Sequence, residues 1–248
     1  MNERNQRPVA VVTGASSGIG AATATRLARD GFEVILGARR VDKLSEIAGP
    51  IGAVAHSLDV RDASSIDAFV SEVGTVNVLI NNAGLALGLE PIAEIQDEAL
   101  QTMWETNVLG LIRMTRALLP KLEASGNGHI VNLGSTASFE TYIGGGGYTA
   151  SKHAVRAITR TLRLELLGKP IRVTLVAPGL VETEFSLVRF GDDAEKAARP
   201  YEGIDPLIAE DIADCIAWAV TRPVHVNVDE IVVRPRAQAT STVVARNS

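Results

Sequence analysis

The sequence has a single cysteine, Cys215, among its 248 residues. One cysteine cannot form a disulfide within the chain, nor can it build a cysteine-based metal cluster. Cys215 falls in register with Ile212, Ile216 and Ala219 on one face of a predicted helix. We therefore expect a buried thiol that packs as a small hydrophobic side chain. The four histidines show no metal-ligand spacing, so we expect no metal site.

Long basic runs and long apolar runs are also missing. The formal net charge is -5 at pH 7, and with no basic patch we expect no nucleic-acid partner. The first residues, MNERNQRPVA, have no apolar signal core, and no run reaches the roughly 18 apolar residues that a membrane span needs. We therefore expect a cytoplasmic protein without a membrane partner. Aromatic residues are scarce, whereas small and branched apolar residues are plentiful, which is typical of a parallel sheet between helices.

Seven apolar, β-branched runs alternate with amphipathic segments along the chain. The runs are continuous rather than alternating, as in strands covered on both faces. They span residues 8–14, 32–38, 51–60, 76–84, 128–135, 171–179 and 229–235. The amphipathic segments predict helices at residues 18–30, 41–48, 62–73, 97–124, 150–167 and 209–221.

This repetition predicts an α/β, doubly wound Rossmann fold, with a seven-stranded parallel sheet and helices on both faces. No repeat and no long flexible linker divides the chain, so we expect a single domain over residues 8–235. We expect residues 1–7 to be a disordered tail and residues 236–248 to be a loose or partner-docked one.

A glycine-rich turn follows the first predicted strand and leads into a helix. Glycines permit a tight turn and let the backbone approach a pyrophosphate closely, and the N-terminus of the helix favours an anion. The spacing is G-x-x-x-G-x-G rather than G-x-G-x-x-G, so the strand and helix on either side carry the interpretation. The residues that we expect at this dinucleotide-binding turn are Gly14, Ser16, Ser17, Gly18, Ile19 and Gly20.

The end of the second predicted strand indicates which dinucleotide binds. An NAD site usually places a carboxylate there, for the ribose 2′-hydroxyl, but this chain has Ala38, Arg39 and Arg40. A guanidinium can bond two phosphate oxygens at once, so Arg39, and more weakly Arg40, predicts a 2′-phosphate and hence NADP. The alternative is that both arginines are solvated surface residues.

Asp59 ends the third apolar run, where it has two candidate roles. Its carboxylate either accepts a hydrogen bond from the adenine amine, or it caps the next helix, as Asp62 also can. Both roles stay open at this point.

Tyr148 and Lys152 are four residues apart at the start of a predicted helix, which places them on one face. A phenol has an ordinary pKa of about 10, and a nearby ammonium group should lower that pKa. An isolated pair of this kind is more often a surface pair, so its context matters. Ser135 ends the strand before this helix and can hold a substrate oxygen beside the tyrosine. Asn107 is a polar residue within an apolar helical stretch, where an asparagine normally faces solvent.

With these residues assembled, the chain resembles the short-chain dehydrogenase/reductase family along nearly its whole length. The matching segments, in the family's order and spacing, are TGASSGIG, LDV, NNAG (81–84), the asparagine of TNVLG, GST (134–136), YTASK and APG (177–179). The resemblance implies that Tyr148 gives or takes the proton while Ser135 orients the substrate oxygen. It also implies that Lys152 binds the nicotinamide ribose and that Asn107 binds a water feeding a proton relay to Lys152, which completes a catalytic tetrad.

The resemblance further implies a set of cofactor contacts, with Ala38-Arg39 similar to the family's NADP-preferring arrangement, and it assigns Asn81 to the sheet. The implied contacts are Asp59, Val60, Asn82, Ala83, Gly84, Tyr148, Lys152, Pro178, Gly179, Val181 and Thr183.

Longer stretches at 81–91, 114–120, 128–138 and 178–190 are similar to the NADP-dependent 3-hydroxy acid dehydrogenases, which act on serine, L-allo-threonine and 3-hydroxyisobutyrate. This similarity implies hydride transfer to or from a small 3-hydroxy acid or β-hydroxy amino acid. The segment TYIGGGG before Tyr148 is unusually rich in glycine and departs from the pattern. Arg189 is a candidate partner for a carboxylate and equally a surface residue, and the polar segment around Gly191 suggests a mobile lid.

Two other functions are considered: a general ketone or aldehyde reductase of the same family, and a sensor that binds NADPH without turnover. The intact Ser135, Tyr148 and Lys152 argue against the sensor. The predicted helices 97–124 and 150–167 are apolar all round, which favours a partner on their outer face. Because members of the family commonly pair these helices, we expect a homotetramer, with a dimer as the alternative.

Overall fold

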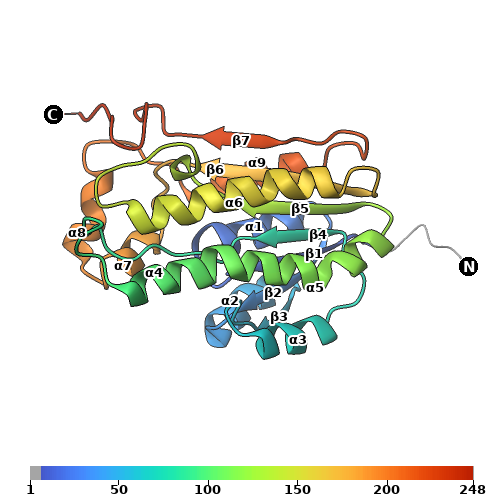
Figure 1. Cartoon of the computed structure of the whole chain (residues 1–248). Helices are drawn as coiled ribbons and strands as arrows, with labels where there is room; N and C mark the ends of the chain where they lie inside the picture. The colour runs from blue at the N-terminus through green and yellow to red at the C-terminus, as the bar shows by residue number, and fades with distance from the viewer. Residues whose placement is uncertain (1–6, 248) are drawn as a thin grey trace, which may run out of the picture.

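Seven parallel strands form the central sheet of the computed structural model, which describes residues 7–247. The spatial order is β3-β2-β1-β4-β5-β6-β7, so the direction of winding reverses between β1 and β4 (Figure 1). This arrangement confirms the predicted doubly wound fold. The strands are β1 (Val9–Thr13), β2 (Glu33–Ala38), β3 (Val54–Ser57), β4 (Val78–Asn81), β5 (Gly128–Leu133), β6 (Ile171–Pro178) and β7 (Glu230–Val233).

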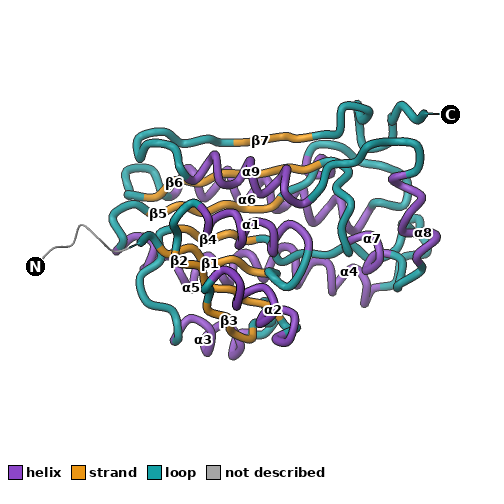
Figure 2. The backbone as a smooth tube through the Cα atoms, turned by 180° about the vertical axis from the view of Figure 1, so that it is seen from behind, coloured by secondary structure: helices purple, strands orange, loops and turns teal. Residues whose placement is uncertain are grey.

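Helices cover both faces of the sheet, and each face has its own hydrophobic core. Figure 1 views the face covered by α3 (Ala63–Ser71), α5 (Gly110–Ala124) and α6 (Gly146–Glu165). Figure 2 views the opposite face, with α1 (Gly18–Arg29), α2 (Val41–Ile51) and α9 (Ala209–Val220). Leu27 and Ile216 are fully buried in the core between the sheet and α1, α2 and α9. Leu118 and Phe69 are buried in the core between the sheet and α3, α5 and α6. The continuous apolar runs of the strands are explained by this burial on both sides.

Two predicted helices differ from the observed ones in ways that matter for the site. The helix predicted at 150–167 begins four residues earlier, at Gly146, so Tyr148 lies in its first turn. The helix predicted at 97–124 is interrupted: α4 (Asp97–Trp104) continues through a π-helical turn, Glu105–Leu109, into α5. A π turn inserts an extra residue into the helical repeat and often marks a functional position. Asn107 lies in this turn, and it is buried rather than solvent-facing.

The polar segment around Gly191 folds into two short helices, α7 (Phe185–Arg189) and α8 (Ala194–Ala198), which apolar periodicity did not predict. Between them Asp192 has a φ of 66°, a conformation that is uncommon without glycine. The Asp193 side chain accepts a hydrogen bond from the Lys196 backbone N–H and so caps α8. The predicted mobility of this lid stays a prediction.

The C-terminal residues after 235, predicted to be a loose or partner-docked tail, pack against their own chain. The buried Gln238 accepts a hydrogen bond from the Leu180 N–H through its Oε1 at 2.9 Å. Ser241 donates its backbone N–H and its hydroxyl to one oxygen of Glu140, at 2.6 and 2.8 Å. Segment 236–247 therefore contributes to the same end of the molecule as α7. Disorder was predicted for residues 1–7, of which residues 1–6 lie outside the described residues. Arg7 is described, and its side chain donates to the carbonyls of Gly31 and Phe32.

Cys215 is half-buried, which corrects the expectation of a buried thiol. Ile212 and Ile216 are fully buried, but the neighbouring Asp214 and Trp218 are exposed. Cys215 therefore lies at the border of the buried face of α9 instead of at its centre. No helix within residues 7–247 has the length and apolar character of a membrane span.

Candidate active site

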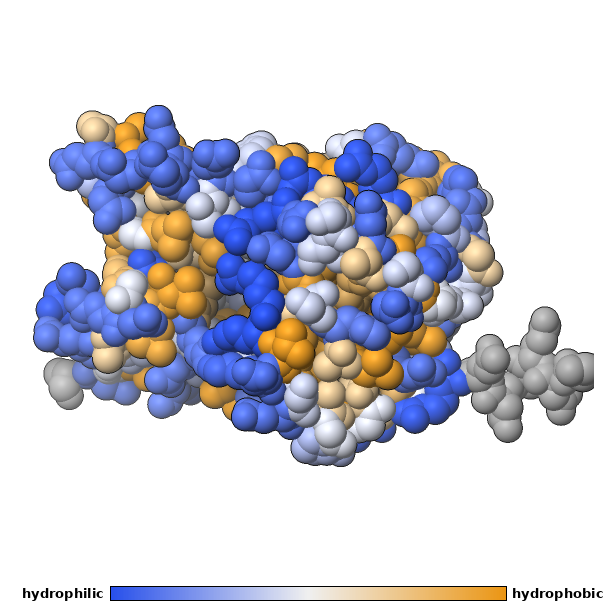
Figure 3. Space-filling view, turned by 90° about the horizontal axis from the view of Figure 1, so that it is seen from below, coloured by the Kyte–Doolittle hydropathy of each residue, from blue (hydrophilic) through white to orange (hydrophobic). Residues whose placement is uncertain are grey.

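A cavity of about 650 Å³ opens at the carboxyl ends of β1, β4, β5 and β6. The winding of the sheet reverses at this point, and in open α/β sheets ligands bind in the crevice that results. Figure 3 shows the surface hollowed at the end of the molecule that carries α7 and α8, with hydrophobic side chains inside the hollow. The cavity lies where the sequence motifs were expected to meet.

Most of the predicted cofactor residues line this cavity, but Gly20 does not. A Cβ atom on Gly20 would overlap the Asn82 side chain and the Gly14 carbonyl, so this glycine allows the turn and α1 to pack closely. Besides Tyr148 and Lys152, the predicted residues in the lining are Gly14, Ser16, Ser17, Gly18, Ile19, Arg39, Arg40, Asp59, Val60, Asn82, Ala83, Gly84, Pro178, Gly179, Val181 and Thr183.

The glycine-rich turn is held in shape by the end of β4. Gly14 has a φ of 64°, and a Cβ there would lie 2.8 Å from the Ala83 Cα. The Asn82 side-chain amide donates to the carbonyls of Thr13 and Gly14, at 2.9 and 3.1 Å. Within residues 7–247 no side chain caps α1, so the N–H groups of its first turn are available to an anion. These features fit the pyrophosphate of a dinucleotide.

Arg40 reaches from the end of β2 into the glycine-rich turn. Its Nη2 donates to the hydroxyls of Ser17, at 2.8 Å, and of Ser16, at 3.0 Å. Its Nη1 lies 2.8 Å from the Glu184 carboxylate. Arg39, ranked above Arg40 by the sequence, has an exposed side chain and forms no ion pair within the part of the chain that the structure describes. The structure thus places both cations at the cavity, and Arg40 is the one with defined contacts.

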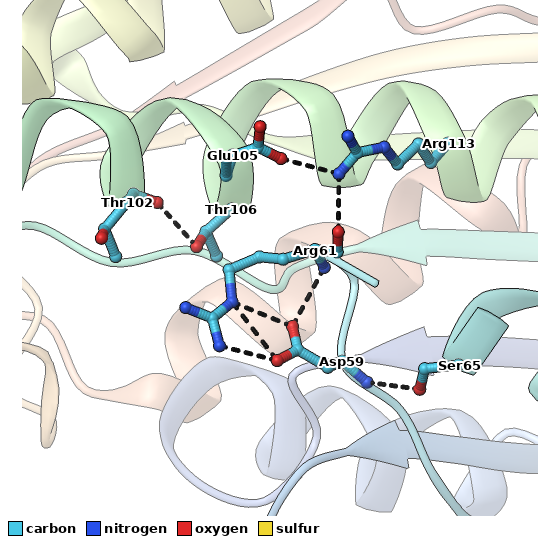
Figure 4. A network of polar contacts seen from close by, with 7 residues as sticks. All are labelled: Asp59, Arg61, Ser65, Thr102, Glu105, Thr106 and Arg113. Carbon is cyan, nitrogen blue, oxygen red and sulfur yellow. Dashed lines mark hydrogen bonds and ion pairs between the residues drawn. The ribbon is translucent and has the colours of Figure 1, made fainter. Parts of the chain in front are cut away.

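Asp59 forms an ion pair with Arg61, with 2.7 Å between Oδ2 and Nη2 (Figure 4). The hydrogen bond from Arg61 lowers the pKa of Asp59 below its ordinary value. Arg113 of α5 donates to the Arg61 carbonyl at 2.8 Å and also pairs with Glu105. The cap of α3 is Asp62, which accepts from the Ser64 N–H at 2.8 Å. The helix-capping role that was considered for Asp59 therefore belongs to Asp62.

Ser135, Tyr148 and Lys152 meet on the floor of the cavity. Tyr148 and Lys152 are both buried, and the Lys152 Nζ lies 5.9 Å from the centre of the Tyr148 ring. Lys152 donates to the Leu133 carbonyl at 2.7 Å, which holds its side chain against the end of β5. The Ser135 hydroxyl donates to the Pro178 carbonyl at 3.4 Å, and Ser135 acts to lower the pKa of Tyr148 against the effect of burial. The three predicted side chains are thus brought together as the sequence indicated.

Burial dominates the protonation of this group. It raises the pKa of Tyr148 to about 12 and lowers the pKa of Lys152 to about 8. The sequence led us to expect that Lys152 would lower the tyrosine pKa, yet the cation that opposes the rise is Arg189. Burial penalises the charged forms of both Tyr148 and Lys152, which accounts for the difference. The protein environment by itself therefore keeps the phenol protonated, as a proton donor requires.

Asn107 does not line the cavity and lies behind its wall. Its Oδ1 accepts from the Leu85 N–H at 2.8 Å, and its Nδ2 donates to the Leu85 carbonyl at 2.8 Å. The same Nδ2 donates to the Ser151 hydroxyl at 3.0 Å. Asn107 therefore links the segment after β4 to Ser151 of α6, and Ser151 directly precedes Lys152. A Cβ on Gly84 would lie 3.2 Å from the Asn107 Oδ1 and 3.5 Å from the Lys152 Nζ, so both polar groups flank this glycine.

The side of the cavity opposite the glycine-rich turn consists of residues that the sequence left outside the predicted site. Tyr142 comes from the glycine-rich segment before α6, Phe185 and Arg189 from α7, and Tyr201 from the short helical turn at 199–201. The Arg189 guanidinium donates to the Tyr142 hydroxyl at 2.7 Å and lies 5.0 Å from the centre of the Tyr148 ring. Its Nε is buried without a hydrogen-bond partner in the described part of the chain. The sequence had indicated Arg189 as a candidate carboxylate partner, and Tyr142 only as part of the unusual glycine-rich segment before Tyr148.

The glycine-rich segment before Tyr148 is explained by close packing. Gly144 has a φ of 74°, and a Cβ there would overlap the Leu89 carbonyl. A Cβ on Gly147 would lie 2.5 Å from the Cε of Met103 in α4. The segment from 85 to 95 and α4 therefore pack closely against the loop that leads into the first turn of α6. This packing supports the position of Tyr142 at the mouth of the cavity.

Comparison with known proteins agrees with this geometry. Residues 8–192 match the model of the short chain dehydrogenase family. An uncharacterized oxidoreductase of Mycobacterium tuberculosis (strain CDC 1551 / Oshkosh) is 54% identical over 237 residues, which cover 96% of this chain and 94% of the relative. The NADP-dependent 3-hydroxy acid dehydrogenase YdfG of Salmonella typhi is 42% identical over 238 residues, covering 93% and 96%.

A solved structure has the same architecture over its full length. It is the closed form of a serine dehydrogenase complexed with NADP+, which superposes with a TM-score of 0.92 at 38% identity and covers 97% of this chain and 100% of that one. Matches of this extent, together with the seven motifs and the cavity that they line, establish that the chain belongs to the short-chain dehydrogenase family.

Proposed function

We propose that this protein is an NADP(H)-dependent oxidoreductase that transfers a hydride to or from the hydroxyl-bearing carbon of a small 3-hydroxy acid or β-hydroxy amino acid. The single observation that carries the substrate class is the meeting of Tyr148, Ser135 and Arg189 in one cavity. A proton donor lies there beside a cation. The relatives named as 3-hydroxy acid and serine dehydrogenases support the same class.

The cofactor side of the cavity fits NADP. The turn from Gly14 to Gly20 and the N-terminus of α1 would hold the pyrophosphate, and Arg39 and Arg40 would bind the 2′-phosphate. The absence of a carboxylate at Ala38 favours a phosphate over a hydroxyl at that position. When bound, NADP supplies the ring carbon that accepts or returns the hydride.

Tyr148 is proposed as the acid and base of the reaction. In the direction of reduction its phenol donates a proton to the carbonyl oxygen of the substrate, and Ser135 orients that oxygen. In the direction of oxidation the phenolate form of Tyr148 takes the proton from the substrate hydroxyl. With a pKa of about 8, Lys152 is largely charged at neutral pH, and its position against Leu133 and Gly84 suits contact with a ribose hydroxyl. Asn107 is proposed to act through the Leu85 and Ser151 contacts that hold this region.

Arg189 is proposed to bind the substrate carboxylate. Its buried Nε faces no acceptor within residues 7–247, and one of its other nitrogens is already held by Tyr142. A guanidinium oriented in this way can form a charge-assisted hydrogen bond with a carboxylate oxygen. Because Arg189 lies beside the Tyr148 ring, a short acid can present its hydroxyl to the phenol and its carboxylate to the guanidinium together.

A homotetramer is the proposed assembly, with a dimer as the alternative. The described chain exposes Trp104 at the end of α4 and Leu164 near the end of α6, which supports an outer face that packs on another copy. Light scattering at micromolar concentration tests this proposal, and a monomer would contradict both assemblies. The cytoplasmic location stays a prediction.

A panel of substrates and cofactors tests the proposed function. Oxidation rates are measured with NADP+ or NAD+ for L-serine, L-allo-threonine, 3-hydroxyisobutyrate and a neutral secondary alcohol of similar size. We expect NADP+ to be preferred and the acids to have higher kcat/KM than the neutral alcohol. A preference for the neutral alcohol would indicate the general reductase instead. Tight NADPH binding without turnover of any compound would indicate the sensor.

A further inference from the structure

Glu184 links the two sides of the cavity through charge. Its carboxylate oxygens pair with Arg40, at 2.8 Å, and with Lys43, at 2.9 Å. Arg40 at the same time donates to Ser16 and Ser17 of the glycine-rich turn. These ion pairs hold the pKa of Glu184 at about 2, so the carboxylate is charged at neutral pH. A negative charge therefore lies against Arg40, which lines the cavity at the proposed 2′-phosphate site, and against Lys43, which lies outside the lining.

A 2′-phosphate and the Glu184 carboxylate need the same donors. Guanidinium groups bind both anions with the same planar geometry, and ammonium groups attract both. Two anions cannot share Arg40 and Lys43 without mutual repulsion. NADP carries a phosphate at this ribose position and NAD carries a hydroxyl. A 2′-phosphate that binds Arg40 therefore competes with the carboxylate for the same donors, whereas the hydroxyl of NAD does not.

The displaced residue also begins the wall that faces the substrate. Glu184 is the N-terminal flanking residue of α7, which carries Phe185 and Arg189. The Phe185 ring lies 5.5 Å from the Tyr148 ring, centre to centre. When the side chain of Glu184 leaves Arg40 and Lys43, the start of α7 loses its link to the first turn of α2.

We propose that Glu184 is a cofactor-selectivity residue that competes with the 2′-phosphate for Arg40 and Lys43, and that NADP frees the start of α7 by displacing it. This inference rests on the proposed use of NADP. Glu184 thus opposes the affinity that the arginines provide, and it makes the substrate wall sensitive to which cofactor is bound.

Binding of NADPH and NADH to Glu184→Gln tests the competition. Dissociation constants are measured by fluorescence titration for the wild type, for this variant and for Glu123→Gln. Glu123 is an exposed carboxylate that pairs with Lys169 at 2.6 Å, outside the cavity, so it controls for the loss of one negative charge. Exposed ion pairs stabilise modestly, so we expect Glu184→Gln to bind NADPH about fivefold more tightly. NADH affinity should stay within about twofold, and the control should match the wild type.

Each other result overturns the inference. If Glu184→Gln bound NADPH and NADH equally more weakly than the wild type, Glu184 would instead help to hold either cofactor in place. Unchanged affinities would mean that it forms a surface ion pair of no consequence for binding. A wild-type protein that binds no NADPH would contradict the proposed function itself, which separates the two failures.

Hydrogen exchange in the wild type provides an independent measurement. We expect the peptide covering residues 183–190 to exchange faster with saturating NADPH than with saturating NADH. The difference should disappear in Glu184→Gln, because no carboxylate remains to be displaced. Equal exchange with both cofactors in the wild type would overturn the coupling to α7.

Discussion

The wall of the cavity made by the turns after β1, β2 and β4 depends on backbone conformation, whereas the opposite wall depends on side chains. On the first wall, Gly14 has a positive φ, and the Asn82 amide holds the carbonyls of the turn. On the second wall, Tyr142 comes from the loop before α6, Arg189 from α7 and Tyr201 from the helical turn at 199–201. The Arg189 guanidinium donates to the Tyr142 hydroxyl, and the Tyr201 hydroxyl bonds to Ser186 of α7. The first wall suits a constant ligand, and the second can change with the substrate while the fold stays the same.

Tyr148 lies between the two walls, and its loss should have the largest effect. Tyr148→Phe removes the proposed proton donor, so we expect kcat to fall by about a thousandfold or more, since general acid–base groups contribute on that scale. NADPH affinity should change by no more than about threefold, because the phenol hydroxyl forms only a small part of the cofactor-binding site. Steady-state kinetics and fluorescence titration measure the two quantities. Unchanged turnover would refute the enzymatic account.

The side-chain wall is tested by Arg189→Met. A hydrogen bond to a charged group contributes about 1.5–3 kcal/mol, so kcat/KM for a 3-hydroxy acid should fall by about a hundredfold. For a neutral alcohol of similar size the loss should be no more than about threefold, since no carboxylate is left unbound. Arg199→Met serves as the control, because Arg199 is exposed on the neighbouring segment and pairs with Glu195. Equal losses for acid and alcohol would show that Arg189 only shapes the wall.

The sheet beneath both walls carries its own pH sensitivity. Burial, with Arg172 nearby, lowers the pKa of His129 from 6.5 to about 3. Below about pH 6.5 the unfolded chain binds a proton at His129, whereas the folded chain does not. The free energy of unfolding therefore falls as the pH decreases below about 6.5. Between pH 7 and pH 5 this group should remove about 2 kcal/mol from the free energy of unfolding.

Chemical denaturation at the two pH values measures the loss of stability. His129→Gln should flatten the pH dependence, while His153→Gln, at an exposed position, should keep the slope of the wild type. Identical slopes for wild type and His129→Gln would place the sensitivity elsewhere, in the walls instead of the sheet.

The smallest effect is expected for Arg39→Ala on the backbone wall. Its guanidinium is exposed, so its attraction for a 2′-phosphate is partly screened, and NADPH affinity should fall by about tenfold. NADH affinity should stay unchanged, since NADH has no 2′-phosphate. Equal losses for the two cofactors would remove Arg39 from the phosphate site and leave that role to Arg40.

The backbone wall and the sheet could be predicted from the sequence because their signals are local. The turn around Gly14 follows a continuous apolar run directly, and Lys152 follows Tyr148 by one helical turn. Parallel strands bring such turns to one edge of the sheet, so separate motifs converge without further information.

The remaining features depend on contacts between distant segments, which periodicity cannot show. The π turn that buries Asn107 follows from its bonds to Leu85 and Ser151, and the closely packed glycines around Gly144 follow from contact with Leu89. The docking of the C-terminal segment through Gln238 is of the same kind. The direction of the Tyr148 pKa shift was missed because it depends on burial, whose extent only the assembled cavity reveals.

A crystal structure with bound NADP+ and a 3-hydroxy acid tests the central claim most directly. The account predicts the substrate hydroxyl within hydrogen-bond distance of the Tyr148 and Ser135 oxygens, the hydroxyl-bearing carbon facing the nicotinamide C4, and the carboxylate on the Arg189 guanidinium. A substrate whose carboxylate points to solvent, with Arg189 turned away and the Tyr148 hydroxyl out of reach of the reacting carbon's oxygen, would contradict it.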